Sequence, residues 1–98
     1  MEIKDARKEI DRIDRQMTAL LRERLLLCDA IAEYKKERGL PLTDPVRERE
    51  KLEEVSGFIG EDLKHYAEKL YAAIFEISKE RQAEIIAAGP AAGKKIDP

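Results

Sequence analysis

The first thirty-nine residues, MEIKDARKEIDRIDRQMTALLRERLLLCDAIAEYKKERG, decide the fold, because they contain neither proline nor glycine before Gly39. Mostly apolar side chains recur in them at spacings of three and four residues, which is the heptad pattern of an amphipathic helix. Since glycine commonly ends a helix, we predict one helix of thirty-odd residues, about 50 Å long. The repeating positions, which we call the heptad stripe, are Ile3, Ala6, Ile10, Ile13, Met17, Leu20, Arg24, Leu27, Ile31 and Tyr34.

Two further helices are predicted after this one. Asp44-Pro45 supplies a capping side chain and a proline suited to a first helical turn, so a short second helix starts there. It should stop at Ser56-Gly57. A third helix of about 25 residues opens at Gly60 with Glu61-Asp62 and ends at Gly89-Pro90.

The predicted fold is therefore all-α, with one very long, one short and one long helix in each chain. We expect a helical domain over residues 1–88 and a flexible tail over residues 89–98, because the tail has too few apolar residues to pack. A monomer of 98 residues buries only about two thirds of the surface its unfolded chain exposes. A partner subunit would help to bury the heptad stripe.

Composition excludes several classes of function. Charged residues make up 41% of the chain and aromatic residues 5%, which is typical of long helices, and the net charge of −2 provides no basic field for a nucleic acid or an anionic membrane. One cysteine, Cys28, and one histidine, His65, provide no disulfide, zinc set or Ser-His-Asp triad, so we expect no metal or cofactor. Without a membrane span or signal-peptide pattern, a cytoplasmic protein is expected.

Two cationic side chains of the long helix are candidates for an anion site. Arg24 lies on the heptad stripe, where a charged group is costly unless an anion meets it. It is equally well explained as a polar residue that sets the register of a coiled coil. Lys35 follows three helical turns later on the same face, about 16 Å away, so both side chains can reach one small ligand. Taken singly, Lys35 is more simply a solvated helix end.

The other candidate polar residues lie on the second and third helices. Ser78 and Gln82 are one turn apart and continue an apolar face, so we favour burial for both, although a drifting stripe would expose them. Asp44 has a sufficient role as a helix cap, and surface charge is the default interpretation of Arg47 and Glu48.

Taken together, these residues resemble the all-helical class of chorismate mutase over about residues 3–87. The resemblance rests on several runs at compatible spacing, none of which is specific alone. They are Ala6-Arg7-Lys8-Glu9-Ile10-Asp11-Arg12-Ile13-Asp14, Leu21-Arg22-Glu23-Arg24, Glu33-Tyr34-Lys35, Asp44-Pro45-Val46-Arg47-Glu48, and Ser78 with Gln82.

The resemblance implies an intertwined helical homodimer that converts chorismate to prephenate by an intramolecular [3,3] rearrangement, in the biosynthesis of phenylalanine and tyrosine. Lys35 and Gln82 would donate to the ether oxygen, Glu48 would accept from the substrate hydroxyl near the Asp44 backbone, and Arg24 would bind a carboxylate. The implied catalytic residues are Lys35, Gln82, Arg24 and Glu48, and the implied substrate-binding residues are Arg7, Arg24, Lys35, Asp44, Arg47, Glu48, Ser78 and Gln82.

Arg7 would come from the partner chain. It lies 28 residues from Lys35 on one helix, about 42 Å, so the two cannot contact one small molecule within one chain. Lys51 and Lys79 depart from the family pattern, which more often has apolar residues beside the site. The alternatives are an isochorismate-pyruvate lyase of the same fold and a non-enzymatic helical dimerisation module.

Overall fold

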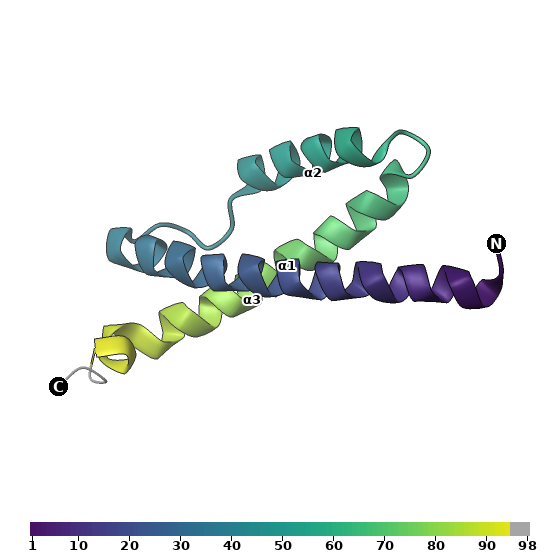
Figure 1. The fold of residues 1–98 in the computed structure, drawn as a ribbon. Helices are drawn as coiled ribbons and strands as arrows, with labels where there is room; N and C mark the ends of the chain where they lie inside the picture. The colour runs from purple at the N-terminus through teal and green to yellow at the C-terminus, as the bar shows by residue number, and fades with distance from the viewer. Residues whose placement is uncertain (95–98) are drawn as a thin grey trace.

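The computed structural model describes residues 1–94, with side chains through residue 89, and confirms the all-α prediction. Its helices are α1 (Ile3–Arg38), α2 (Pro45–Ile59) and α3 (Lys64–Lys94), and no strand occurs among these described residues. Figure 1 shows α1 crossing α3, while α2 and α3 form a hairpin. Within the described chain α3 packs on both other helices, and α1 and α2 do not pack on each other.

The end of α1 is the one that the sequence predicts. Gly39 adopts a left-handed conformation with φ 64°, which glycine reaches without steric cost. The Leu40 N–H donates to the Lys35 carbonyl at 2.9 Å, closing the last turn. Basic side chains at Lys35, Lys36 and Arg38 lie in this turn, where the helix dipole favours positive charge.

The start of α2 confirms the predicted cap, but its predicted end at Ser56-Gly57 was wrong. Asp44 Oδ1 accepts a hydrogen bond from the Arg47 N–H at 3.1 Å, and Pro45 opens the helix. The helix passes through Gly57, since an internal glycine costs only about 1 kcal/mol relative to alanine. It ends at Ile59, before Gly60, whose φ of 100° is incompatible with the helix and whose N–H donates to the Ser56 carbonyl.

The third helix begins at Lys64 because residues 61–63 form a turn, in which the Leu63 N–H donates to the Gly60 carbonyl at 3.2 Å. At Gly89 the backbone leaves the helical conformation, as expected, with φ 72° and ψ 168°. Helical structure then resumes through Lys94, so the predicted stop at Gly89-Pro90 is a break rather than an end. The division into a domain (1–88) and a tail (89–98) stays a prediction, and residues 95–98 lie outside the described residues.

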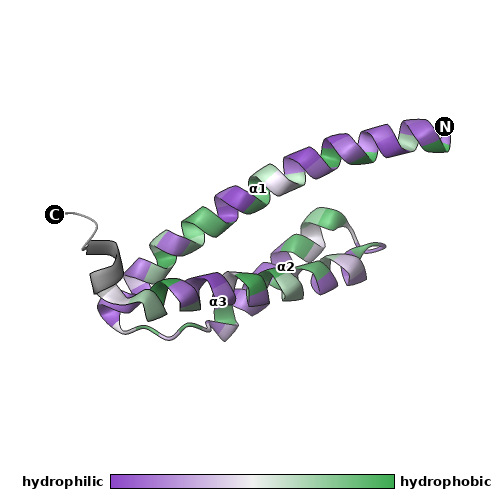
Figure 2. Cartoon of the chain, turned by 90° about the horizontal axis from the view of Figure 1, so that it is seen from below, coloured by the Kyte–Doolittle hydropathy of each residue, from purple (hydrophilic) through white to green (hydrophobic). Residues whose placement is uncertain are grey.

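The chain is much more extended than a compact domain of its length. Its radius of gyration is 17.3 Å, against about 13 Å for a compact chain of 98 residues. The cause is the N-terminal half of α1, which extends away from α2 and α3 (Figure 2). Among the described residues, the buried apolar side chains are Cys28, Ala32, Val55 and Ala67.

The heptad stripe is not buried within the chain. Ile10 is 53% exposed, and Leu20 and Leu27 are 61% and 64% exposed. The face of α1 that packs against α3 is a neighbouring one, which contains Cys28 and Ala32. Among the described residues, the large apolar side chains of the stripe therefore form a largely exposed surface. Within the described residues, no helix is long and apolar enough to cross a membrane.

Candidate active site

Among the polar contacts that join the C-terminal half of α1 to α3, two involve predicted site residues of both helices. Arg24 Nη1 donates to Ser78 Oγ at 2.6 Å. Lys35 Nζ donates to Gln82 Oε1 at 2.9 Å and to the Leu42 carbonyl at 2.8 Å. Ser78 and Gln82 are 7% and 6% exposed, so the predicted burial of both is confirmed. These contacts show why polar side chains occur on an apolar face of α3: each has a cationic partner on α1.

These four side chains line one pocket of about 550 Å³ at the junction of the three helices. Seven of the eight predicted substrate-binding residues lie around it. They are Arg24 and Lys35 from α1, Asp44, Arg47 and Glu48 from the start of α2, and Ser78 and Gln82 from α3. The eighth, Arg7, is exposed on the N-terminal half of α1 and does not line the pocket.

The cap and first turn of α2 carry three of the polar residues that line the pocket. The Asp44 carboxylate is engaged as the helix cap, and Asp44 lines the pocket. Arg47 and Glu48 follow in the first turn. Glu48 is half-buried and forms an ion pair with Lys79 of α3 at 3.2 Å.

The pocket combines an excess of positive charge with apolar walls. Five cationic side chains line it, those of Arg24, Lys35, Arg47, Lys51 and Lys79, against the two carboxylates of Asp44 and Glu48. The walls are formed by Leu27, Cys28, Ile31, Leu42, Tyr71 and Phe75. Charge-assisted hydrogen bonds are strongest where apolar walls exclude water. The pocket is therefore suited to a small anionic ligand that has an apolar part.

Comparison with known proteins identifies the family of the chain. Residues 6–83 match the family model described as chorismate mutase type II. The chain is a member of this family. It is 39% identical over 100 residues, 93% of this chain and 27% of the relative, to a bifunctional chorismate mutase/prephenate dehydratase of Aquifex aeolicus. It is 42% identical over 45 residues, 46% of each protein, to a chorismate mutase of Methanocaldococcus jannaschii. No solved structure matches. The matched regions span about a quarter and just under half of these two curated relatives.

An ion pair that sequence reasoning missed sets the register of α1 on α3 in this chorismate mutase family member. Arg81 donates to both carboxylate oxygens of Asp29, at 2.6 and 2.8 Å. The hydrogen bond from Arg81, assisted by its charge, lowers the pKa of Asp29. The pair lies between the Arg24–Ser78 and Lys35–Gln82 contacts along α1, so it aligns them. No sequence pattern indicates it, because charged residues on exposed helix faces are common.

The sequence also missed the partners that hold the pocket lysines. The Leu42 carbonyl, in the loop before α2, fixes Lys35 Nζ. Lys51 forms an ion pair with Glu54, whose pKa is lowered first by the hydrogen bond from Lys51 and then by its charge. The i,i+3 spacing of Lys51 and Glu54 on one helix was the available signal.

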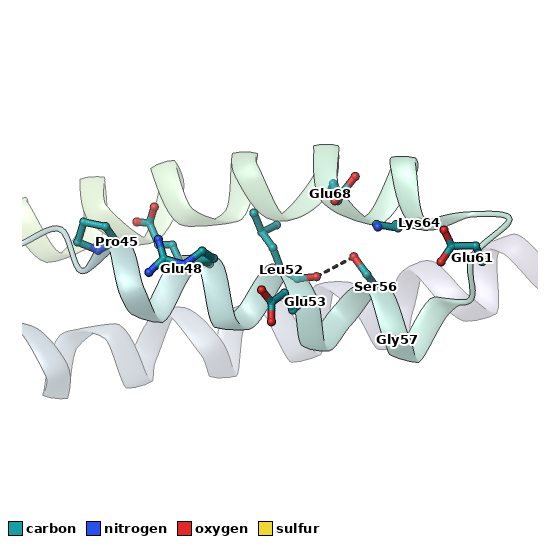
Figure 3. A pocket seen from close by; sticks show the side chains of 10 residues that line it. Pro45, Glu48, Leu52, Glu53, Ser56, Gly57, Glu61, Lys64 and Glu68 are labelled. Atoms are coloured by element: carbon teal, nitrogen blue, oxygen red, sulfur yellow. Dashed lines mark hydrogen bonds between the residues drawn. The ribbon is translucent and has the colours of Figure 1, made fainter.

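A second hollow lies between α2 and α3 and has a different character (Figure 3). It has a volume of about 650 Å³ and is lined by four glutamates, Glu48, Glu53, Glu61 and Glu68, with Arg49 and Lys64. Although it is larger, its negative charge opposes a dianionic ligand. Ser56, which lines it, donates its hydroxyl to the Leu52 carbonyl at 2.7 Å. The pocket at the helix junction is therefore the candidate active site.

Proposed function

We propose that the chain is an isomerase that converts chorismate to prephenate by an intramolecular [3,3] rearrangement, in the biosynthesis of phenylalanine and tyrosine. The observation that carries the proposal is the junction pocket. Seven of the eight predicted substrate-binding residues, drawn from three helices, line it together. The names of the relatives and the family of the chain support the same reaction.

This reaction needs positioning and positive charge rather than a nucleophile. A C–O bond breaks while a C–C bond forms, no proton is transferred, and negative charge develops on the ether oxygen. The substrate must be held in its compact conformer, with cationic donors directed at that oxygen. A rate enhancement of about 10⁶-fold requires about 8 kcal/mol, which a few such charge-assisted hydrogen bonds can supply.

The observed contacts suggest a role for each side chain. Arg24 and the Arg7 of a second copy would bind the two substrate carboxylates, since the guanidinium group matches a carboxylate in two places. Arg47 and Ser78 would assist them. Because the Gln82 Oε1 already accepts from Lys35, the amide NH₂ of Gln82 is left to donate. Lys35 and Gln82 would therefore donate together to the ether oxygen.

Glu48 and the start of α2 would discriminate between substrates. The Glu48 carboxylate, near the Asp44 backbone, would accept a hydrogen bond from the substrate hydroxyl. An analogue without that hydroxyl would leave the Glu48 carboxylate without its hydrogen-bond partner in the complex. This loss costs more binding free energy than the loss of an apolar contact.

The proposed enzyme is a homodimer in which a second copy supplies Arg7 to the pocket. Arg7 and Lys35 lie 28 residues apart on α1, about 42 Å, so one chain cannot bring both to one ligand. The exposed heptad stripe supports this assembly, because pairing two copies of α1 would bury it. We place the activity in the cytoplasm and expect it to need no metal or cofactor.

The test is incubation of the purified protein with chorismate and, separately, with isochorismate. The proposal expects chorismate to disappear and an isomer of equal mass to form, which acid converts to phenylpyruvate. Release of pyruvate from isochorismate without this isomerisation would identify the lyase. No turnover of either compound would contradict an enzymatic role and favour a helical dimerisation module.

A further inference from the structure

Lys79 occupies a position in the pocket that the proposed reaction does not explain. Its Nζ lies 3.2 Å from Glu48 Oε2 of α2 and 3.0 Å from Glu76 Oε1 of its own helix. The Lys79 and Glu48 side chains are 21% and 28% exposed, and both line the junction pocket. The Glu76 side chain is 77% exposed and does not line it. Lys79 thus bridges the carboxylate of Glu48, which lines the pocket, and the exposed carboxylate of Glu76.

The pocket has an electrostatic conflict that this pair resolves. A site that binds a dianion gains from its cations, but an unpaired carboxylate in the same cavity repels the ligand through a medium that screens poorly. Without Lys79, Glu48 would be such a carboxylate. With Lys79 at 3.2 Å the pair is neutral overall, while Glu48 keeps a second oxygen that can accept a hydrogen bond.

We propose that Lys79 is a positioning residue for Glu48: it neutralises and orients this carboxylate, so that the pocket can hold a hydroxyl acceptor and a dianion together. The inference rests on the proposed function and extends it to a residue outside the eight predicted ones. The pKa of Lys79 is raised by its hydrogen bonds to Glu76 and Glu48, so the lysine stays charged at neutral pH.

A purely structural role makes a different prediction. Lys79 joins α3 to α2, and a partly exposed ion pair of this kind contributes little to stability. If joining the two helices were its whole role, any loss of kcat on removal of the lysine would accompany a loss of thermal stability. Loss of a counter-charge instead weakens binding of ligand and transition state alike, which raises KM and leaves kcat nearly unchanged.

The experiment is a double-mutant cycle with Lys79→Gln, Glu48→Gln and the double variant. It measures kcat and KM for chorismate, the Kd of a dicarboxylate transition-state analogue by calorimetry, and the thermal midpoint of each protein. We expect Lys79→Gln to raise KM and Kd about 10-fold with kcat changed less than about 2-fold. In the Glu48→Gln background the same substitution should change Kd less than about 2-fold, because no carboxylate then needs neutralising.

Two further variants separate charge from packing. Lys79→Arg keeps the charge, so the KM of this variant should lie within about 3-fold of the wild-type KM. Glu76→Gln removes the partner of Lys79 that lies outside the pocket and should leave KM unchanged, which makes it the matched control.

An equal loss of binding in both Glu48 backgrounds would overturn the inference, because Lys79 would then contact the ligand directly. Parallel losses of kcat and thermal stability, without recovery by arginine, would overturn it in favour of a structural tie. In both cases turnover of chorismate by the wild type would leave the proposed function standing. A wild type that neither turns over chorismate nor binds the analogue would remove the proposed function and the inference together.

Discussion

The two halves of α1 carry the same sequence pattern and have opposite surroundings. Residues 3–20 and 21–38 share the heptad stripe and lack internal glycine and proline. The buried side chains of the helix, Cys28 and Ala32, both belong to the second half. The first half extends away from α2 and α3 (Figure 2). A heptad stripe therefore indicates that a face is apolar, and it does not say which surface covers that face.

The predicted site residues of α1 are also divided between its two halves. The C-terminal half of α1 brings Arg24 and Lys35 into the junction pocket, where Ser78 and Gln82 meet them. The N-terminal half carries Arg7, which has no place in the pocket of its own chain. If the proposed dimer forms, the half that extends away from α2 and α3 completes the site of the other chain. The following variants test the roles assigned to these two halves.

The largest effect is expected from one arginine of each half. Arg7→Ala and Arg24→Ala should each be nearly inactive as homodimers, because every site then lacks one carboxylate partner. Mixing the two variants should restore activity, since one site of each heterodimer is intact and the other lacks both arginines. With random exchange at equal amounts, about half the dimers are mixed, so about a quarter of wild-type turnover should return.

This complementation needs subunit exchange, which mild denaturant or co-expression can provide. Arg12→Ala is the matched control, because Arg12 lies in the same half of α1 off the stripe, paired with Glu9 at 3.1 Å. It should keep wild-type activity. If heterodimers confirmed by native mass spectrometry stay inactive, the shared site is wrong, and so is the role proposed for Arg7.

A smaller effect is expected from the last turn of the C-terminal half. Lys35→Ala should lower kcat/KM at least about 100-fold, the cost of losing one donor directed at developing charge. Lys36→Ala is the neighbouring control, because Lys36 binds the Ile85 carbonyl and Glu33 rather than the pocket. The measurement is kcat/KM for chorismate of both variants by steady-state kinetics. Equal activity of the two proteins would mean that Lys35 is only a solvated helix end.

The smallest effect concerns the register of the two packed helices. Asp29→Asn removes the charge that Arg81 binds and should lower the thermal midpoint at neutral pH by a few degrees. Because the hydrogen bond from Arg81 holds the folded-state pKa of Asp29 below its ordinary value, the ion pair contributes stability above that ordinary pKa, and this stability is lost as the pH falls through the folded-state pKa. Thermal unfolding of wild type and variant across this range should show the difference shrinking in acid. A difference that persists in acid would assign the loss to packing.

Much of the candidate site could be predicted from sequence because helical spacing is a local rule. Arg24 and Lys35 share a face since eleven residues make three turns, and both line the pocket. Ser78 and Gln82 interrupt an apolar face, which predicted their burial. The site assignment itself came from resemblance, since these spacings alone left a coiled-coil register residue and a solvated helix end as alternatives.

The sequence by itself determined three helices, the cap at Asp44 and the stop at Gly39, because each depends on a residue and its immediate neighbours. It misjudged Gly57, where helical hydrogen bonding outweighs a small intrinsic cost. Only the tertiary structure decided which cation meets which partner: Arg24 with Ser78, Lys35 with Gln82, Arg81 with Asp29 and Lys79 with Glu48. These contacts join residues up to 54 positions apart, and their pairing depends on how the helices cross. Local sequence rules do not specify that crossing.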